Sequence, residues 1–113
     1  MLPAKYRITK DKDFKRINAL GKAFFSPRLR VKLLANKLDF SRFTVVVSKK
    51  VSKKATERNY LKRQLREIFR LNKQKIKIGY DIICSAGQKS LGTKYKDLEK
   101  DLIFLLNKAK LLK

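Results

Sequence analysis

The residues best equipped for chemistry in this sequence are guanidinium groups that recur at helical spacing. The segment Lys49–Arg70 is predicted to contain a helix, in which successive residues are about 100° apart. One side of this helix carries four polar residues: Asn59, Arg63, Arg66 and Arg70. Guanidinium groups form paired hydrogen bonds to phosphate, and an amide can pair with a base edge or a ribose hydroxyl. Like charges at i, i+4 destabilise an isolated helix by about a few tenths of a kcal/mol per pair. We therefore expect this side to bind a polyanion.

The helix that carries this basic side has an apolar opposite side, which predicts packing against a core. That side is formed by Leu61, Leu65, Ile68 and Asn72. Thr56 is the predicted N-cap, and Glu57 is favourable in the first turn. A lysine-rich loop precedes the helix. Together, the residues predicted to bind the polyanion are Lys49, Lys50, Lys53, Lys54, Arg58, Asn59, Lys62, Arg63, Arg66 and Arg70.

The composition supports a polyanionic partner for the whole chain. With 31 basic and 9 acidic residues among 113, the formal net charge is +22. Self-repulsion of this order is tolerated mainly when a partner neutralises it, and nucleic acid is the first candidate before an anionic membrane surface. The hydrophobic fraction of 43%, with seven Phe and four Tyr, argues against disorder. We predict one domain over residues 1–113.

Protein-borne catalysis is not expected. The sequence has no histidine, which excludes Ser-His and Cys-His pairs and His-ligated metals. Cys84 is the only cysteine and lies in an apolar run, so it is predicted to be a buried hydrophobe in a protein of the reducing cytosol. The nine carboxylates are scattered near lysines. We predict no catalytic residue, no metal ligand, no secretory signal, no transmembrane helix and a cytoplasmic location.

The elements that must position the basic helix follow from periodicity. The predictions in chain order are a helix at 10–20 ended by Gly21, a short strand at Phe24–Phe25, strands at 28–34 and 42–48, the basic helix, a central strand at Tyr80–Ala86, and a helix from about Thr93 with its apolar stripe continuing to Leu112. The order α-β-β-β-α-β-α predicts an α+β sandwich with the helices packed on one small sheet.

The strand at 28–34 alternates strictly, with Leu29, Val31 and Leu33 on one side and Arg28, Arg30 and Lys32 on the other. This cationic strand face, the first helix and the basic helix can form a groove for a single strand of nucleic acid. Phe14 can supply a stacking surface there, although its spacing alone favours a core position. A helix-turn-helix and the RRM aromatic signature do not match the sequence.

Several of these residues resemble the signature of the protein subunit of bacterial ribonuclease P. In that family an Arg-Asn-Arg motif opens a helix that continues with Lys-Arg and Arg-Glu pairs. The corresponding residues here are Val46 to Lys50, Arg58-Asn59, Lys62-Arg63, Arg66-Glu67, Arg70, Asp13-Phe14, Gly21 and Tyr80–Ala86. The resemblance covers nearly the whole chain.

The resemblance implies a ribosomal protein S5 domain 2-like fold with a left-handed βαβ crossover through the basic helix. It also implies that a partner RNA carries catalysis, using Mg²⁺ to hydrolyse one phosphodiester in precursor tRNA and release the 5′ leader. The protein is then expected to bind that catalytic RNA through the basic helix and loop. It is expected to hold the single-stranded leader in a central cleft, and so to raise substrate affinity and lower the demand for Mg²⁺.

By the same resemblance, the leader cleft is expected to include Phe14, Arg30 and Lys32. The chain departs from the family pattern at four positions. Tyr60 replaces the second Arg of the motif, Asn18 and Lys32 occupy positions that are often aromatic, and Thr44 stands where Gly is common. The alternatives are a structural ribosomal protein and a basic protein that coats DNA or a membrane surface. We expect neither DNA nor a membrane as the partner.

Overall fold

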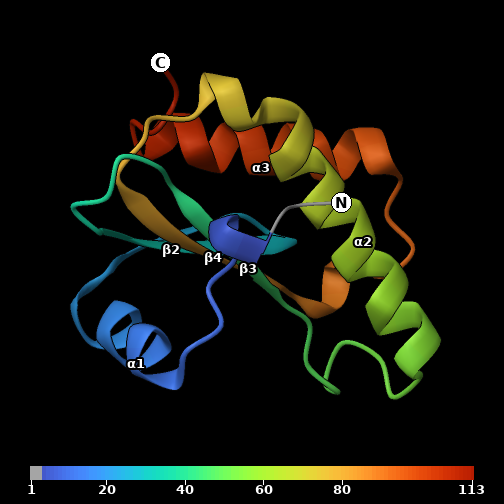
Figure 1. The fold of residues 1–113 in the computed structure, drawn as a ribbon. Helices are drawn as coiled ribbons and strands as arrows, with labels where there is room; N and C mark the ends of the chain where they lie inside the picture. The colour runs from blue at the N-terminus through green and yellow to red at the C-terminus, as the bar shows by residue number, and fades with distance from the viewer. Residues whose placement is uncertain (1–3) are drawn as a thin grey trace.

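A four-stranded sheet with helices on both of its faces forms the structure (Figure 1), a computed structural model that describes residues 4–113. The main elements are α1 (Asp11–Leu20), β1 (Lys22–Phe25), β2 (Leu29–Ala35), β3 (Arg42–Val46), α2 (Ala55–Asn72), β4 (Tyr80–Ala86) and α3 (Tyr95–Lys108). Short 3₁₀ turns lie at Ala4–Tyr6, Lys73–Lys75 and Gln88–Ser90. The predicted order of helices and strands and the α+β class are confirmed.

The strands lie in the order β1-β2-β4-β3, so β4 is central as predicted. β1 pairs with β2 and β2 pairs with β4 in antiparallel fashion, whereas β3 and β4 are parallel and are joined through α2. Four successive residues of β4, from Asp81 to Cys84, are buried because both faces of this strand are covered. The left hand of the β3–α2–β4 connection stays a prediction from the family resemblance.

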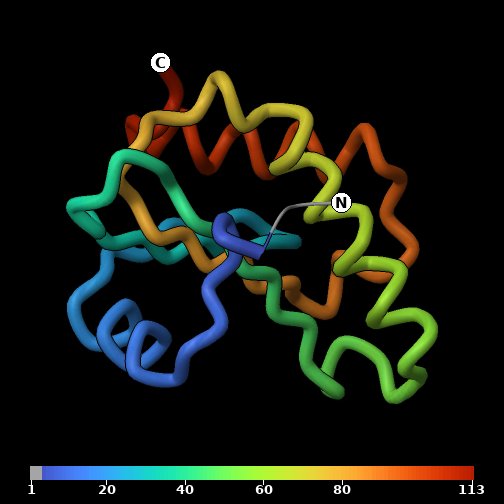
Figure 2. Tube along the Cα trace, in the orientation of Figure 1, coloured from blue at the N-terminus to red at the C-terminus, as the bar shows by residue number. Residues whose placement is uncertain are grey.

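The two faces of the sheet are covered unequally (Figure 2). α2 and α3 pack on one face, where Leu29, Val31 and Leu33 join the main core. Within this core Phe43 lies against Phe69, with ring centroids 4.1 Å apart. α1 lies on the opposite face and covers only part of it. The rest of that face, called here the open face, has no helix over it.

Gly21 ends α1 as predicted, but its backbone is not left-handed, with φ of −75°. A Cβ at this position would lie 2.5 Å from the Ile17 carbonyl oxygen and 2.8 Å from that of Leu33. Glycine is therefore required because the end of α1 closely approaches β2, not because of a special dihedral angle.

Some predicted boundaries are wrong. α2 begins at Ala55, so Thr56 lies inside the first turn and is not the N-cap. Ser52 organises this entry instead, because its hydroxyl accepts a hydrogen bond from the Lys54 N–H (3.1 Å) and donates one to Glu57 (2.6 Å). β3 ends at Val46 rather than at residue 48.

The last helix is also shorter than its apolar stripe. Thr93 precedes α3, and Leu112 lies beyond its end in an isolated antiparallel bridge with Ile76. Across residues 4–113, we find no helix with both the length and the apolar character that crossing a membrane requires.

Candidate nucleic-acid interface

α2 separates its apolar and basic sides as the periodicity predicts. Leu61, Leu65, Ile68 and Asn72 are buried. Phe69, which the periodicity analysis left out, is fully buried as well. The basic side is exposed and consists of Asn59, Arg63, Arg66 and Arg70.

The arginines of α2 differ in whether an internal partner already holds them. Arg70 donates from Nε to Glu67 (3.0 Å), and this hydrogen bond lowers the pKa of Glu67 and raises that of Arg70. Arg58 donates to the Ser52 carbonyl (3.0 Å) and so ties the helix to the preceding loop. Arg63 and Arg66 have neither a hydrogen bond nor an ion pair from their side chains within residues 4–113. They are the two guanidinium groups of this row that are free to bind a ligand.

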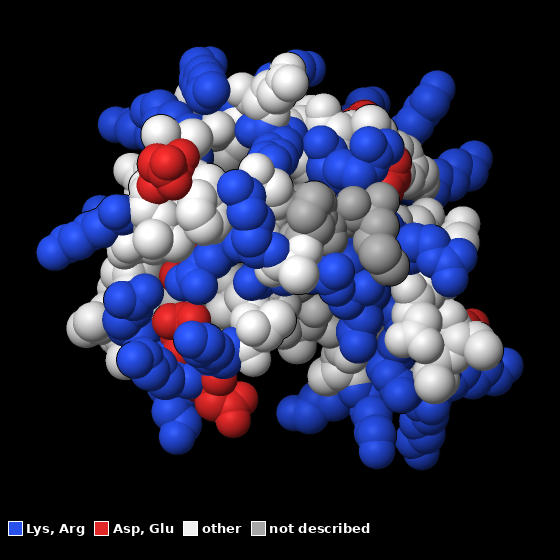
Figure 3. Space-filling view, viewed as in Figure 1, with Lys and Arg blue, Asp and Glu red and all other residues white. Residues whose placement is uncertain are grey.

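The lysine loop, defined as residues 47–54, presents four cations on a fixed backbone. Val47 and Val51 are buried in the main core. The Lys50 carbonyl accepts a hydrogen bond from the Gln88 amide at 3.1 Å. The four exposed side chains are Lys49, Lys50, Lys53 and Lys54. In Figure 3 basic side chains crowd the lower right of the molecule, where this loop and the start of α2 lie.

The open face of the sheet forms a shallow trough that crosses the strands. Strand register places the trough residues in two neighbouring rows. The outer row is Phe25, Arg30, Ser85 and Val46. The inner row is Ala23, Lys32, Ile83 and Thr44, of which Ile83 is buried beneath α1 and is not part of the exposed floor. Figure 3 shows a hollow at the lower edge of the molecule, between the α1 side and the lysine-loop side. The trough therefore runs from the β3 edge to the β1 edge, with α1 and the lysine loop as walls.

The three predicted cleft residues lie on this face but have different surroundings. Arg30 is exposed on the floor. Lys32 is half-buried, and its ammonium donates to the Asn18 carbonyl oxygen (2.7 Å) near the end of α1, where the helix dipole favours a cation. Phe14 packs against the small cluster of Ile8, Ile17 and Ile83, with part of its ring still exposed. Lys32 thus attaches α1 to the sheet through a backbone carbonyl, a contact that does not depend on the side chain at position 18.

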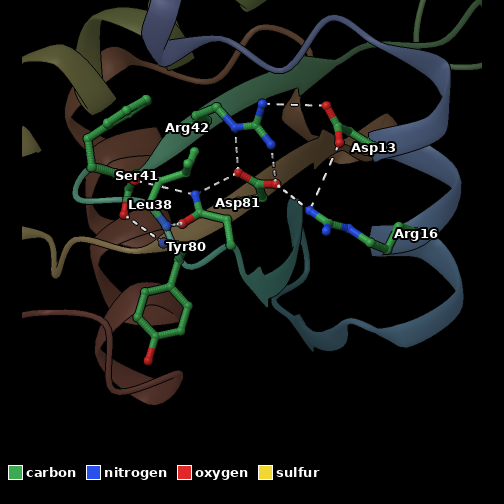
Figure 4. Close-up of polar contacts among 9 residues, drawn as sticks. Asp13, Arg16, Leu38, Ser41, Arg42, Tyr80 and Asp81 are labelled. Atoms are coloured by element: carbon green, nitrogen blue, oxygen red, sulfur yellow. Dashed lines mark hydrogen bonds and ion pairs between the residues drawn. The ribbon is translucent and has the colours of Figure 1, made fainter.

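An ion network around the buried carboxylate of Asp81 fixes the wall formed by α1 (Figure 4). Asp81 is fully buried and accepts hydrogen bonds from Arg42 Nε (2.8 Å), Arg42 Nη2 (2.7 Å) and the Asn36 amide (2.9 Å). The Asp81 hydrogen bonds raise the pKa of Arg42. Arg42 and Arg16 each reach both Asp81 and Asp13, which joins α1 to β3 and β4. Sequence periodicity did not predict this network, although Asp81 as a lone acid in the apolar run of β4 is a signal for it.

Arg7 is a further basic residue that the sequence analysis missed. The segment before α1 lies on the edge of β3, where the Ile8 N–H donates to the Phe43 carbonyl (2.9 Å). A cavity of about 150 Å³ between this segment, β3 and α2 is lined in part by Arg7, Thr44 and Arg66. Within residues 4–113, the buried Nε of Arg7 has no hydrogen-bond partner. Arg7 thereby extends the basic side of α2 to the β3 end of the trough.

The described residues offer no metal-binding cluster of the usual acidic or sulfur ligands. No group of three or more Cys, Asp or Glu in positions 4–113 could hold a metal ion. Cys84 is fully buried, and burial raises the pKa of its thiol to about 12, so the nucleophilic thiolate is suppressed at neutral pH. The carboxylates of residues 4–113 do not form a group that fits a Mg²⁺ site.

Comparisons with known proteins relate the chain to one family. The model of the family described as Ribonuclease P matches residues 2–110. The ribonuclease P protein component of Clostridioides difficile is 40% identical over 103 residues, which covers 90% of each chain. The component of Fusobacterium nucleatum is 40% identical over 109 residues, covering 93% of this chain and 97% of the relative.

Solved structures show the same fold. The RNase P protein of Staphylococcus aureus superposes with a TM-score of 0.88 at 34% identity, covering 96% of this chain and 98% of the other. The RNase P protein from Thermotoga maritima gives a TM-score of 0.83 at 35% identity, with 90% and 96% covered.

Proposed function

The chain belongs to the ribonuclease P protein family and is a protein component of that ribonucleoprotein, and we propose how it acts there. It binds the catalytic RNA through the basic side of α2 and the lysine loop. It holds the single-stranded 5′ leader of precursor tRNA in the trough. The partner RNA carries out the endonucleolytic hydrolysis, and the protein supplies affinity and position.

The observation that carries this proposal is the pair of unneutralised guanidinium groups on α2, next to the four-lysine loop. Arg63 and Arg66 have no acidic partner among residues 4–113, and the lysine loop keeps its backbone fixed while its ammonium groups stay in solvent. Cations preorganised in this way bind phosphates and release condensed counterions from RNA. The same neutralisation reduces the number of Mg²⁺ ions needed to bring RNA and substrate together.

The trough suits a single strand better than a duplex. Its length from the β3 edge to the β1 edge spans four strands, about 14 Å at the usual strand spacing, so the floor contacts only a short stretch of a nucleic-acid strand. Arg30 contributes charge to the floor, and Phe14 contributes part of an aromatic ring from the α1 wall. A backbone-following groove of this kind binds without strong sequence preference, as a leader of variable sequence requires.

Mg²⁺ would supply the Lewis acid and the activated water for the hydrolysis. We assign its binding to the RNA because the acids of this chain that lie nearest the trough, Asp13 and Asp81, are occupied by arginines. The single buried thiol is in keeping with a cytoplasmic ribonucleoprotein, since cytosolic thiols stay reduced.

The decisive experiment measures cleavage of precursor tRNA by a catalytic ribonuclease P RNA at low Mg²⁺, with and without the protein. We expect the protein to stimulate cleavage, and the stimulation to shrink as Mg²⁺ is raised. A charge-matched control replaces Lys96 and Lys100, two exposed lysines on α3, by Ala. Absence of stimulation by the wild-type protein would overturn the proposal. Equal damage from the α3 control and from Arg63→Ala/Arg66→Ala would reject the assigned surface.

A further inference from the structure

The adjacent aromatic residues Phe24 and Phe25 face opposite sides of β1. Phe24 packs against the main core. Phe25 lies on the open face of the sheet and is 61% exposed. Exposing a phenyl ring on a strongly cationic surface gains nothing for folding, since its burial would be favourable.

Phe25 lies beside several polar and cationic side chains at the β1 end of the trough. It pairs in register with Arg30, whose guanidinium carbon is 5.7 Å from the ring centroid. A cavity of about 300 Å³ opens beside the ring, between the β1–β2 turn and the end of β4. Its lining includes Pro27, Arg30 and Ser85. An aromatic face, a planar cation and a hydroxyl therefore meet at one pocket.

Arg30 is the available cation of this group. Within residues 4–113 it has no ion pair, whereas Arg28 in the turn reaches Asp101 of α3 (3.4 Å). Lys32, the next cation along the same face of β2, is held by the Asn18 carbonyl. The guanidinium of Arg30 can therefore contact a ligand and the Phe25 ring together.

We propose that Phe25 and Arg30 form a stacking subsite for one unpaired base of single-stranded RNA where the strand leaves the trough at the β1 edge. This inference rests on the proposed function, because it takes the leader as the strand in the trough. Every base has a π-face, so a ring and a guanidinium plane bind it whatever its identity. The surrounding positive charge favours a polyanion over an apolar protein segment as the occupant.

The chain contains no tryptophan, so Phe25→Trp introduces a single fluorescent reporter at the subsite. Phe104→Trp is the matched control, because Phe104 is 57% exposed on α3 with the Lys108 ammonium 6.0 Å from its ring centroid. Each variant is assembled with the catalytic RNA and mixed with precursor tRNA carrying either a long leader or a leader of one nucleotide. Fluorescence is followed before cleavage proceeds.

We expect the long leader to quench the Phe25→Trp signal and the one-nucleotide leader to leave it unchanged. The Phe104→Trp signal should not respond to either substrate. In parallel, Phe25→Ala should weaken binding of the long-leader substrate about 5- to 10-fold, near the lower end of base stacking on an aromatic ring. Phe25→Tyr should retain the affinity, and the short-leader substrate should bind all variants equally.

An unquenched Phe25→Trp in a complex that binds the long leader would overturn the subsite while leaving the proposed function intact. Equal weakening of both substrates by Phe25→Ala would do the same, because it would indicate a structural effect. Failure of the wild-type protein to stimulate cleavage would instead overturn the proposed function, and the subsite with it.

Discussion

Replacing both Arg63 and Arg66 by Ala should remove RNA affinity with little effect on folding. Both side chains are exposed and without partners in residues 4–113. Surface substitutions of this kind usually change stability by about 0.5 kcal/mol or less. Alanine is also the best helix former, and the change relieves repulsion along the basic side of α2. A loss of binding would therefore report lost RNA contacts.

The magnitude follows from counterion release. If each guanidinium neutralises one phosphate of a structured RNA, the slope of log K against log salt should flatten by ~0.9 per contact, or ~1.8 for the double variant. A fourfold rise in salt, from ~50 to ~200 mM, then weakens the wild type by ~1.1 log units more than the variant. The variant should thus lose most affinity at low salt and converge on the wild type at high salt.

The assay is titration of the catalytic RNA at a series of KCl concentrations. Arg70→Ala is an internal control, since Glu67 already pairs with Arg70 and its loss should flatten the slope by less than one full contact. Lys96→Ala/Lys100→Ala removes two exposed lysines from α3 and should leave the slope close to that of the wild type. An unchanged slope in the Arg63/Arg66 variant would refute the contact assignment. A slope change of the same size in the α3 control would refute the assignment of the RNA contacts to α2.

Three further outcomes are expected. Asp81→Asn should destabilise the fold by about 2–3 kcal/mol, because the charge-assisted hydrogen bonds from Arg42 to the fully buried carboxylate are lost and Arg42 keeps only Asp13 as an acidic partner. Arg16→Ala, at a side chain 45% exposed, should cost about 1 kcal/mol or less. Chemical denaturation measures both, and similar costs would contradict the network. Burial raises the pKa of Cys84 from 9.0 to about 12, so the thiol loses its proton at lower pH in the unfolded chain than in the folded one. The free energy of unfolding should therefore fall by about 1.4 kcal/mol per pH unit above about pH 9. Cys84→Ala should lack this part of the decline at alkaline pH. Phe14→Ala should impair binding of leader-bearing precursor tRNA more than that of mature tRNA, and equal losses would make Phe14 a core residue only.

The chain order of the elements and the two sides of α2 could be read from periodicity, because each depends on local spacing. Leu61, Leu65 and Ile68 had to be buried together once the helix formed, and the arginines opposite them had to face solvent. Arg30 and Lys32 share the cationic face of β2 as alternation predicts, but Arg28 does not, because it precedes β2 and reaches Asp101 of α3. The centrality of β4 followed from its apolar run, which only a strand covered on both faces requires.

The entry of α2 could not be read in the same way. Thr56 fits the preferences for an N-cap, yet the fold assigns that organisation to Ser52, four positions earlier, through hydrogen bonds to Lys54 and Glu57. Propensity gives the residue types that suit a cap, but the path of the preceding loop, anchored by buried Val51, decides which residue is in reach.

The sequence by itself determined the net charge, the amphipathic basic helix and the family, since these depend on residue identity and short-range spacing. Only the tertiary structure decided which charges are available. Glu67 pairs with Arg70, Ser52 holds Arg58, and the Asn18 carbonyl holds Lys32, while Arg63, Arg66 and Arg30 remain unpaired within residues 4–113. Pairing of this kind joins residues from separate elements, or depends on one rotamer among several. It therefore appears only when the strands and helices are placed in space.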